Sequence, residues 1–256
     1  GNIIVDTDNS NSDNNDENDD DDDDDEENNT KNEEEENKIK KWTQPLANLL
    51  VQVRKELLEV HTKAATEKVM SAQSNPDEII TFLQHCQLDV NELCERSEQI
   101  QRYQRVLQLK VSPIDELTTT TTNLNLKLLL WQSWKEWKDK TADWAPTPFK
   151  SIDVEEFSND LQKFTRIAMQ VSSGLSEHPL SPIFKSNVNT FNEILPVIVA
   201  LTNPFLLSSH WAKIENITGI PKLEETSYPL SYLMEKRIGD FVDMIETIAN
   251  DASNEA

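Results

Sequence analysis

Glycine and cysteine are scarce in this chain, whose 256 residues contain four glycines and two cysteines. A phosphate-binding loop needs glycines so that backbone amides can approach the anion, and four scattered glycines cannot build one. Cys86 and Cys94 are eight residues apart, too far for a disulfide within one helix, and indicate a reduced, intracellular chain. No run of about 18 apolar residues and no basic-then-apolar N-terminus occurs, so neither a membrane span nor a signal peptide is predicted.

Metal ligands and catalytic groups are sparse as well. The histidines His61, His85, His178 and His210 stand far apart, and the neighbours His85 and Cys86 would point about 100° apart on a helix, so no zinc site is predicted. No local motif places a nucleophile beside a base. Basic residues are dispersed in a chain of net charge −23, which disfavours nucleic-acid binding. The sequence therefore predicts no catalytic, cofactor-binding or metal site.

Acidic residues dominate the first 40 residues, where 18 of them face three lysines. Nine consecutive carboxylates run from Asp19 to Glu27, and a second run spans Glu33 to Glu36. Like-charge repulsion and the shortage of apolar side chains predict a disordered, low-complexity tail over residues 1–40. Weak calcium binding, nucleic-acid mimicry and docking of a basic partner are the alternatives, although the run lacks the glycine turn and alternating ligands of a calcium loop.

The rest of the chain is rich in leucine, lysine, glutamate and glutamine, and it has almost no strand-like alternation and no Asn-Gly or Asp-Gly hairpin turn. It predicts an all-α fold, an elongated bundle or stack of antiparallel helices that follows the acidic tail. Residues 41–117 form a first block of three amphipathic helices, which we expect to begin near Pro45, at Asn75-Pro76 and at Leu88.

A second helical block is predicted over residues 124–250. The five threonines Thr118–Thr122 predict the connection that precedes it, because β-branched side chains are poor helix formers. Trp131, Trp134 and Trp137 follow at three-residue spacings, so their rings lie along one flank of a helix. Such a stripe is typical of a packed core rather than of a ligand cage.

Proline, aspartate and glycine mark the ends of the later helices. The turn around Pro148-Phe149 ends one helix, and Asp153 caps the next. Asn203-Pro204 is expected to begin another helix, which Gly219 ends in a left-handed conformation. The last helix is predicted from Leu230 to about Asn250.

Three interior features complete this pattern. Pro196 lies within an apolar helical stripe and should kink it. Gly239, inside the last predicted helix, indicates a close contact with another helix. The pair His210-Trp211 has the character of buried residues, and His210 is interpreted as a hydrogen-bonding group at a helix interface rather than as a ligand.

The order and spacing of these landmarks resemble the linker region in the N-terminal part of dynein heavy chains. The resemblance covers residues 124–250 closely and residues 42–109 more loosely, as the end of the preceding tail. Ser209 stands where that family usually has arginine, which removes any charged contact of the arginine but not the packing set by the tryptophan. The residues that carry the resemblance are Leu130-Trp131, Trp144, Pro148-Phe149, Ile152 to Glu155, Leu195-Pro196, Asn203-Pro204, His210-Trp211 and Gly219.

The resemblance implies a mechanical role, as part of an α-helical lever that lies across a ring of AAA+ ATPase modules. ATP and magnesium would belong to that ring, which this fragment lacks, so the fragment itself would not be an enzyme. The implied partners are dynein intermediate and light chains, the rest of the heavy chain and, indirectly, microtubules, with neither nucleic acid nor membrane. The tryptophan-rich helices are most similar to axonemal, inner-arm-type heavy chains, which implies the cytoskeleton of a cilium or flagellum.

Two alternatives remain open from the residues alone. The chain could be a free-standing helical adaptor whose acidic tail docks a basic partner. It could also be an α-helical enzyme whose site joins His61, His85 or His210 to ionisable partners from distant parts of the chain.

Overall fold

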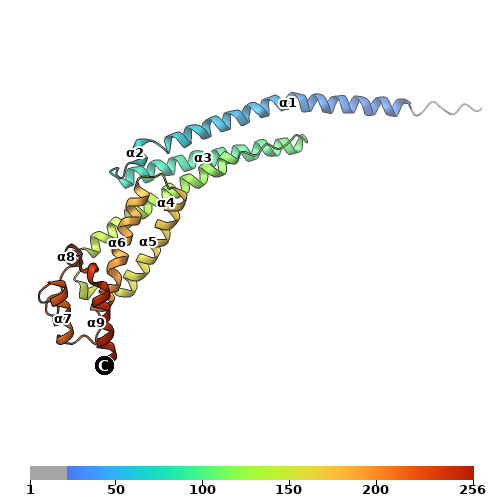
Figure 1. Cartoon of the computed structure of the whole chain (residues 1–256). Coiled ribbons are helices and arrows are strands. Elements are labelled where there is room, and N and C mark those ends of the chain that lie inside the picture. The colour runs from blue at the N-terminus through green and yellow to red at the C-terminus, as the bar shows by residue number, and fades with distance from the viewer. Residues whose placement is uncertain (1–21) are drawn as a thin grey trace, which may run out of the picture. The chain divides into compact units, whose positions relative to one another are not determined.

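The computed structural model describes the backbone of residues 22–256 and the side chains of residues 29–256. This part of the chain forms nine α-helices and two short 3-10 helices without any strand, which confirms the predicted all-α fold (Figure 1). The start of the acidic run, up to residue 21, lies outside the described residues. In chain order the elements are α1 (Asp22–Lys63), α2 (Glu67–Met70), α3 (Pro76–Val106), α4 (Asp115–Trp144), η1 (Phe149–Ser151), α5 (Val154–Gly174), α6 (Leu180–Leu201), α7 (Ser208–Thr218), α8 (Leu230–Glu235), η2 (Ile238–Phe241) and α9 (Val242–Glu255).

The described residues divide into two compact units, residues 22–51 with 100–112 and residues 52–99 with 113–256. In the first unit, Leu46 and Leu50 of α1 and Ile100 of α3 are buried. The buried amide of Gln104 accepts a hydrogen bond from the backbone N–H of Ser112 at 3.1 Å. This bond ties the residues that follow α3 back onto the helix, so the turn is held by a side chain rather than by apolar packing alone.

Helix α1 starts much earlier than the sequence predicts. It begins at Asp22, and Pro45, which we expected near its start, lies inside it. Lys40 and Glu36 form an ion pair at 3.8 Å one turn apart. An exposed pair of this kind adds little, but Leu46 and Leu50, which follow Pro45 on the same helix, are buried, and their packing offsets the loss of the one backbone N–H that proline lacks. The predicted start at Pro45 is therefore wrong, and α1 includes residues 22–40. The helix start predicted at Leu88 is wrong as well, because α3 is one helix from Pro76 to Val106.

The threonine run is helical rather than a connection. Thr118–Thr122 lie within the first turns of α4, and residues 107–114 make the connection instead. The hydroxyl of Thr121 donates a hydrogen bond to the carbonyl of Leu117 at 2.7 Å, while Thr120 is buried. Burial and back-bonding to the preceding turn outweigh the weak helix propensity of β-branched residues, which is why the predicted break is wrong.

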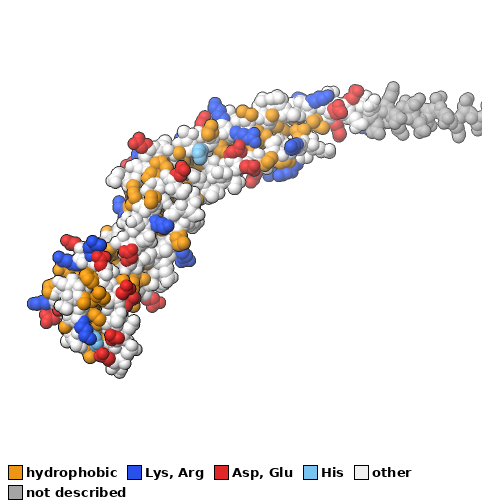
Figure 2. Space-filling view, in the orientation of Figure 1, with side chains coloured by type: hydrophobic (Ala, Val, Ile, Leu, Met, Phe, Trp, Pro, Cys, Tyr) orange, Lys and Arg blue, Asp and Glu red, His pale blue; other side chains and the backbone are white. Residues whose placement is uncertain are grey.

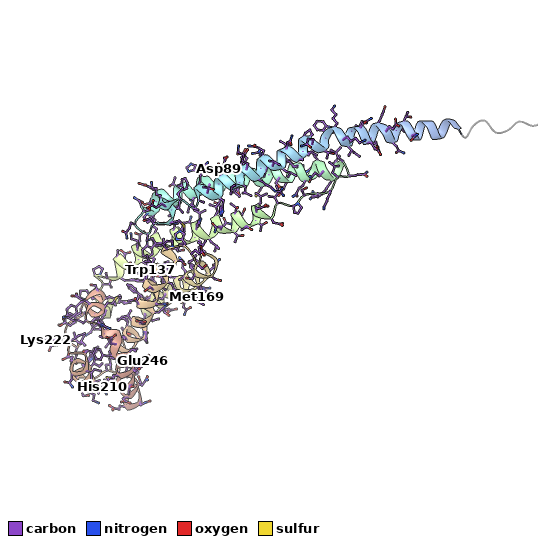
Figure 3. The ribbon with its side chains drawn as sticks, turned by 45° about the horizontal axis from the view of Figure 1, so that its top comes forward. Asp89, Trp137, Met169, His210, Lys222 and Glu246 are labelled. Carbon is purple, nitrogen blue, oxygen red and sulfur yellow. The ribbon has the colours of Figure 1, made fainter. Side chains whose placement is uncertain are left out.

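The second unit is built around the aromatic side chains of α4, α5 and α6. These helices run side by side in Figure 1, and Trp137, labelled in Figure 3, lies inside the bundle with 1% of its surface exposed. Its ring meets Phe164, Phe191 and Phe184 edge-on, with centroids 5.2, 5.1 and 6.3 Å away. Trp131 is fully buried on the same helix. The predicted tryptophan stripe is thus a packed core.

The last helix that the sequence predicts is divided in the structure into two α-helices, α8 and α9, with the short 3-10 helix η2 between them. Arg237, with φ of 55°, adopts the left-handed conformation and separates α8 from η2 and α9, so the continuous helix expected from Leu230 to Asn250 is wrong. The reversal lets the fully buried Ile238 pack into the core. A Cβ at Gly239 would lie 3.9 Å from the carbonyl oxygen of Glu193 on α6, which is an ordinary distance, so packing does not require glycine there.

Candidate functional site: a junction of helix ends around Trp211

The residues after α4 pair with the residues before α8 through their backbones. Phe149 N–H donates to the carbonyl of Tyr228, and Leu230 N–H donates to the carbonyl of Thr147, both at 2.9 Å. Pro148 and Pro229 form an isolated antiparallel bridge at the centre of this pairing. The side chain of Phe149 beneath it is fully buried. The landmark Pro148-Phe149 therefore joins the end of α4 to a segment about 80 residues later in the chain.

Lys150 connects this pairing to Trp211. Its ammonium lies over the indole of Trp211, 5.1 Å from the ring centroid, and donates to the carbonyl of Glu224. Trp211 is 7% exposed, so the predicted burial of the ring is confirmed. A cation over a largely desolvated indole adds to the packing of the ring. Sequence reasoning missed Lys150, because no motif marks a lysine that reaches a distant tryptophan.

His210 ties the start of α7 to the end of α9. Its Nδ1 accepts a hydrogen bond from the backbone N–H of Leu207 at 3.2 Å, which satisfies one of the free donors at the helix start. In the neutral ring the proton is then on Nε2, which lies 3.3 Å from a carboxylate oxygen of Glu255. The imidazole is 1% exposed. This geometry is that of a hydrogen-bonding group at a helix interface.

Asn203, which lies just after α6, also joins two helices through side-chain hydrogen bonds. Its side-chain amide donates to the carbonyl of Ala249 and to the hydroxyl of Ser253, both at 2.8 Å, and its Oδ1 accepts from Phe205 N–H at 3.0 Å. The last of these bonds holds a turn, so α7 begins at Ser208 and the helix start predicted at Asn203-Pro204 is wrong. The amide instead anchors the turn on α9.

The other landmarks lie around this group or away from it. Gly219 ends α7 with φ of 69°, as predicted, and Leu195 and Pro196 lie half-buried inside α6, whereas Ser209 is exposed. Trp144 packs edge-on against Phe157 with centroids 4.7 Å apart. Trp131 is 13 residues before Trp144 on α4, a distance of about 20 Å along the helix axis. The fold thus gathers six landmarks, Pro148, Phe149, Asn203, Pro204, His210 and Trp211, into one helix junction, residues 145–150, 203–211, 228–231 and 249–255, and places the others, among them Trp131 and Trp144, outside these ranges.

Chemical sites of the usual kinds are not found among the described residues. There, no three His, Cys, Asp or Glu side chains are placed to hold a metal ion, and no helix is both long and apolar enough to cross a bilayer. Charged side chains of both signs are interspersed on the face shown in Figure 2. That mixture does not resemble the single-sign surface typical of nucleic-acid binding.

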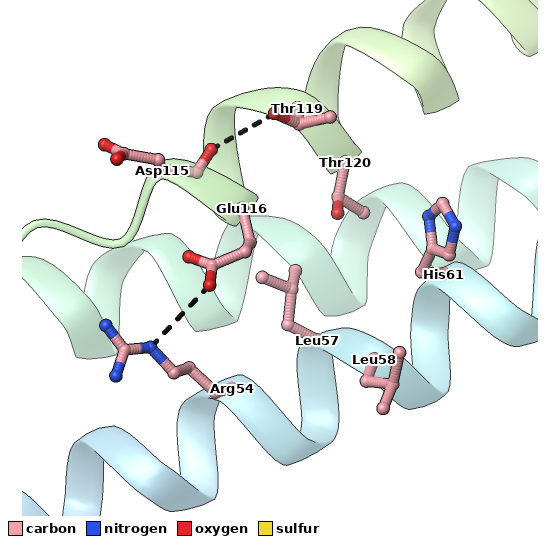
Figure 4. A pocket seen from close by; sticks show the side chains of 8 residues that line it. All are labelled: Arg54, Leu57, Leu58, His61, Asp115, Glu116, Thr119 and Thr120. Atoms are coloured by element: carbon pink, nitrogen blue, oxygen red, sulfur yellow. Dashed lines mark hydrogen bonds and ion pairs between the residues drawn. The ribbon is translucent and has the colours of Figure 1, made fainter.

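A surface groove of about 460 Å³ lies between α1 and α4 in the second unit, and its lining includes His61 (Figure 4). Asp115 and Glu116 also line it, but Glu116 faces Arg54, with 4.0 Å between Arg54 Nε and the carboxylate. No hydrogen bond or ion pair joins His61 to either carboxylate in the described part of the chain. The groove therefore lacks the paired acid and base that the enzyme hypothesis requires.

His178 is a second buried histidine. It is 2% exposed, and its Nδ1 accepts a hydrogen bond from Leu180 N–H at 3.2 Å. Burial lowers the pKa of His178 from 6.5 to about 4, and the positive charge of Lys127 acts in the same direction. The ring is therefore neutral at physiological pH and serves packing.

We expect His178 to make the fold sensitive to acid. Because its pKa is about 4 in the folded chain and 6.5 in the unfolded chain, the unfolded state binds more protons between these values. Stability is full above pH 6.5 and falls by about 3 kcal/mol as the pH drops to 4. His178→Asn, which keeps an acceptor for Leu180 N–H but cannot be protonated, should lose this component in urea unfolding measured from pH 7 to 4.

The exposed histidine His61 gives the control for this measurement. His61→Asn makes the same replacement at the surface and controls for the exchange of an imidazole for an amide as such. If the unfolding free energy of His178→Asn changed with pH as much as that of the wild type, His178 would not be the source of the acid sensitivity. Contributions from other groups are common to both proteins and cancel in this comparison.

Comparison with known proteins decides the family. The family described as "Dynein heavy chain, N-terminal region 2" matches residues 117–256, a stretch that contains all the landmarks and the helix junction. The chain belongs to this family. Human dynein axonemal heavy chain 6 is 30% identical over 221 residues, which are 86% of this chain and 5% of that protein.

Other dynein heavy chains align over much of the same length. Mouse dynein axonemal heavy chain 3 is 22% identical over 202 residues, 77% of this chain, and human dynein axonemal heavy chain 8 is 24% identical over 213 residues, 82% of this chain. This chain spans about 5% of the length of these relatives. The predicted membership of a dynein heavy chain N-terminal region is therefore confirmed.

Proposed function

We propose that this chain is a load-bearing segment of an axonemal dynein heavy chain, made of the end of the tail and the start of the linker. The helix junction carries the proposal, because it joins the ends of α4, α6, α7, α8 and α9 through backbone pairing and buried side-chain bonds. A site devoted to chemistry would need converging ionisable groups in a pocket. The junction instead offers the connections by which force passes from one helix to the next.

The dimensions of the helices support this role. α4 has 30 residues and spans about 45 Å at 1.5 Å per residue. It is braced by α5 and α6 through edge-on aromatic contacts, and packed interiors transmit strain because they are nearly incompressible. A bundle of this kind bends far less than the loops between helices.

The remaining expectations follow from membership of the whole motor. In this proposal ATP and magnesium are bound in a AAA+ ring elsewhere in the heavy chain, and the segment itself has no catalytic site. The partners are that ring and the intermediate and light chains, with microtubules reached only through the motor. The axonemal relatives favour the cytoskeleton of a cilium or flagellum. No observation on the described residues supports the free-standing adaptor.

The test uses the intact heavy chain that contains this segment. Phe149→Ala removes the buried side chain at the backbone pairing between residues 147–149 and 228–230, called the α4–α8 pairing. We expect the velocity of microtubule gliding to fall by more than half, while the rate of ATP turnover changes less than twofold. Met169→Ala is the matched control, because this α5 side chain is 62% exposed (Figure 3). Equal velocities for the two variants, or ATP hydrolysis by the 256-residue chain alone, would contradict the proposal.

A further inference from the structure

Lys127 is an exceptional residue within the second unit. It belongs to α4, where Leu124, Leu128 and Leu130 are buried around it, and is itself only 4% exposed. Lysine is almost never so fully buried unless it is paired. Removing an ammonium from water costs several kcal/mol, so something must compensate the charge.

The partner of Lys127 is a backbone carbonyl at the end of another helix. Lys127 Nζ donates to the carbonyl oxygen of Ala64 at 2.7 Å, and Ala64 directly follows the last residue of α1. Carbonyls at a helix C-terminus lack partners within the helix and carry the negative end of its dipole. Among the described residues, no carboxylate lies within ion-pairing distance of Lys127, so the end of α1 is its counterpart.

A second buried donor lies in the same layer. Trp131, one turn after Lys127, has its Nε1–H buried without an acceptor among the described residues. Its ring lies edge to face with that of His178, with centroids 6.3 Å apart. The charge of Lys127 and the backbone of Val69 both act on His178, so this turn lies close to the layer. The nearby thiol of Cys86 has its pKa raised by burial and is protonated, so it offers no negative charge.

We propose that Lys127 is a buried latch that holds the end of α1, the connection and α2 (residues 64–70, called the turn below) against α4 in one position. When the turn is in place, its carbonyl compensates the ammonium. If the turn moves away, the ammonium loses the hydrogen bond to Ala64, its one hydrogen-bond partner among the described residues, and a donor left unsatisfied in a largely apolar site costs more than a lost apolar contact. The turn is therefore docked or released as a whole. A pulling force along α1 is passed to α4 through the hydrogen bond between Lys127 and Ala64. This inference does not depend on the motor role.

The latch can be tested by hydrogen exchange in the full chain. Lys127→Met keeps most of the length of the side chain but removes the charge and the donor. Hydrophobic replacement of a buried charge is often neutral for global stability, so a local effect can be separated from unfolding. We expect exchange of the backbone amides in residues 64–70, several of which are hydrogen-bonded, to rise at least tenfold, with exchange in α5 and α6 unchanged.

Two further variants make the outcome decisive. Lys140→Met removes another lysine of α4 that is partly exposed and paired with Asp160 at 2.7 Å, and it should leave the turn protected. Lys127→Gln keeps a neutral donor and should give exchange between that of the wild type and of Lys127→Met. Wild-type protection of residues 64–70 in Lys127→Met, equal exchange in the Gln and Met variants, or a uniform loss of protection across all helices would overturn the proposal.

Discussion

Trp137→Ala is expected to lower the free energy of unfolding of the second unit by about 4–5 kcal/mol, the upper part of the range for a buried aromatic side chain. The indole is 1% exposed and meets the rings of Phe164, Phe184 and Phe191 edge-on. These rings come from two other helices, α5 and α6, and a rigid aromatic cluster cannot collapse into the space that the indole leaves. The loss therefore includes both the transfer of the ring to water and the cavity.

The measurement is urea unfolding followed by far-ultraviolet circular dichroism, with Trp134→Ala as the matched control. Trp134 lies one turn earlier on α4, is half-buried and has one ring contact, with Phe184 at 6.1 Å. Its removal should cost roughly 1–2 kcal/mol, because only part of the ring area is withdrawn from water. Equal costs for the two variants would mean that the core is not centred on Trp137.

Trp211→Ala is expected to destabilise the helix junction by about 3–5 kcal/mol. The ring is 7% exposed and carries the ammonium of Lys150 over its face. Removing it opens a cavity beneath the end of the α4–α8 pairing and leaves Lys150 with fewer contacts. In an intact heavy chain, the same change should weaken the link between α7 and the rest of the junction.

Unfolding by urea and limited proteolysis between α6 and α8 would measure this loss. Phe205→Ala is the control, since that side chain is 51% exposed in the turn before α7 and should cost less than about 0.5 kcal/mol. Lys150→Met separates the charge from the packing, with an expected loss of about 1 kcal/mol. A cost below about 1 kcal/mol for Trp211→Ala would show that the ring adds little to the junction.

Several features of the fold could be predicted because they depend on a few neighbouring residues. Asp153 accepts hydrogen bonds from the N–H groups of Glu155 and Glu156, both at 3.0 Å, as expected of a helix cap. Gly219 adopts the left-handed conformation that ends α7. The three-residue spacing of the tryptophans correctly indicated a core. Capping, chain reversal at glycine and helical periodicity are local effects, so they are readable from short stretches of sequence.

The wrong predictions share a different cause. Propensity alone predicted a break at Thr118–Thr122 and a helix start at Pro45, yet burial of Thr120 on α4 and of Leu46 and Leu50 on α1 outweighed it. Arg237 could not be recognised as a left-handed residue, because nothing in its chemistry distinguishes it from the arginines of a regular helix. Propensity differences are a few tenths of a kcal/mol per residue, and tertiary packing routinely exceeds them.

The sequence by itself determined the helical class, the main caps and the aromatic core, because each depends on residue types at short spacings, and its resemblance to dynein heavy chains indicated the family. The tertiary structure alone decided which distant residues meet: Lys150 with Trp211, His210 with Glu255, Asn203 with α9 and Lys127 with the end of α1. A lysine or an asparagine has the same local chemistry wherever it stands. Its partner is chosen by helix packing, which sums many weak contacts over the whole unit and leaves no pattern in any single stretch.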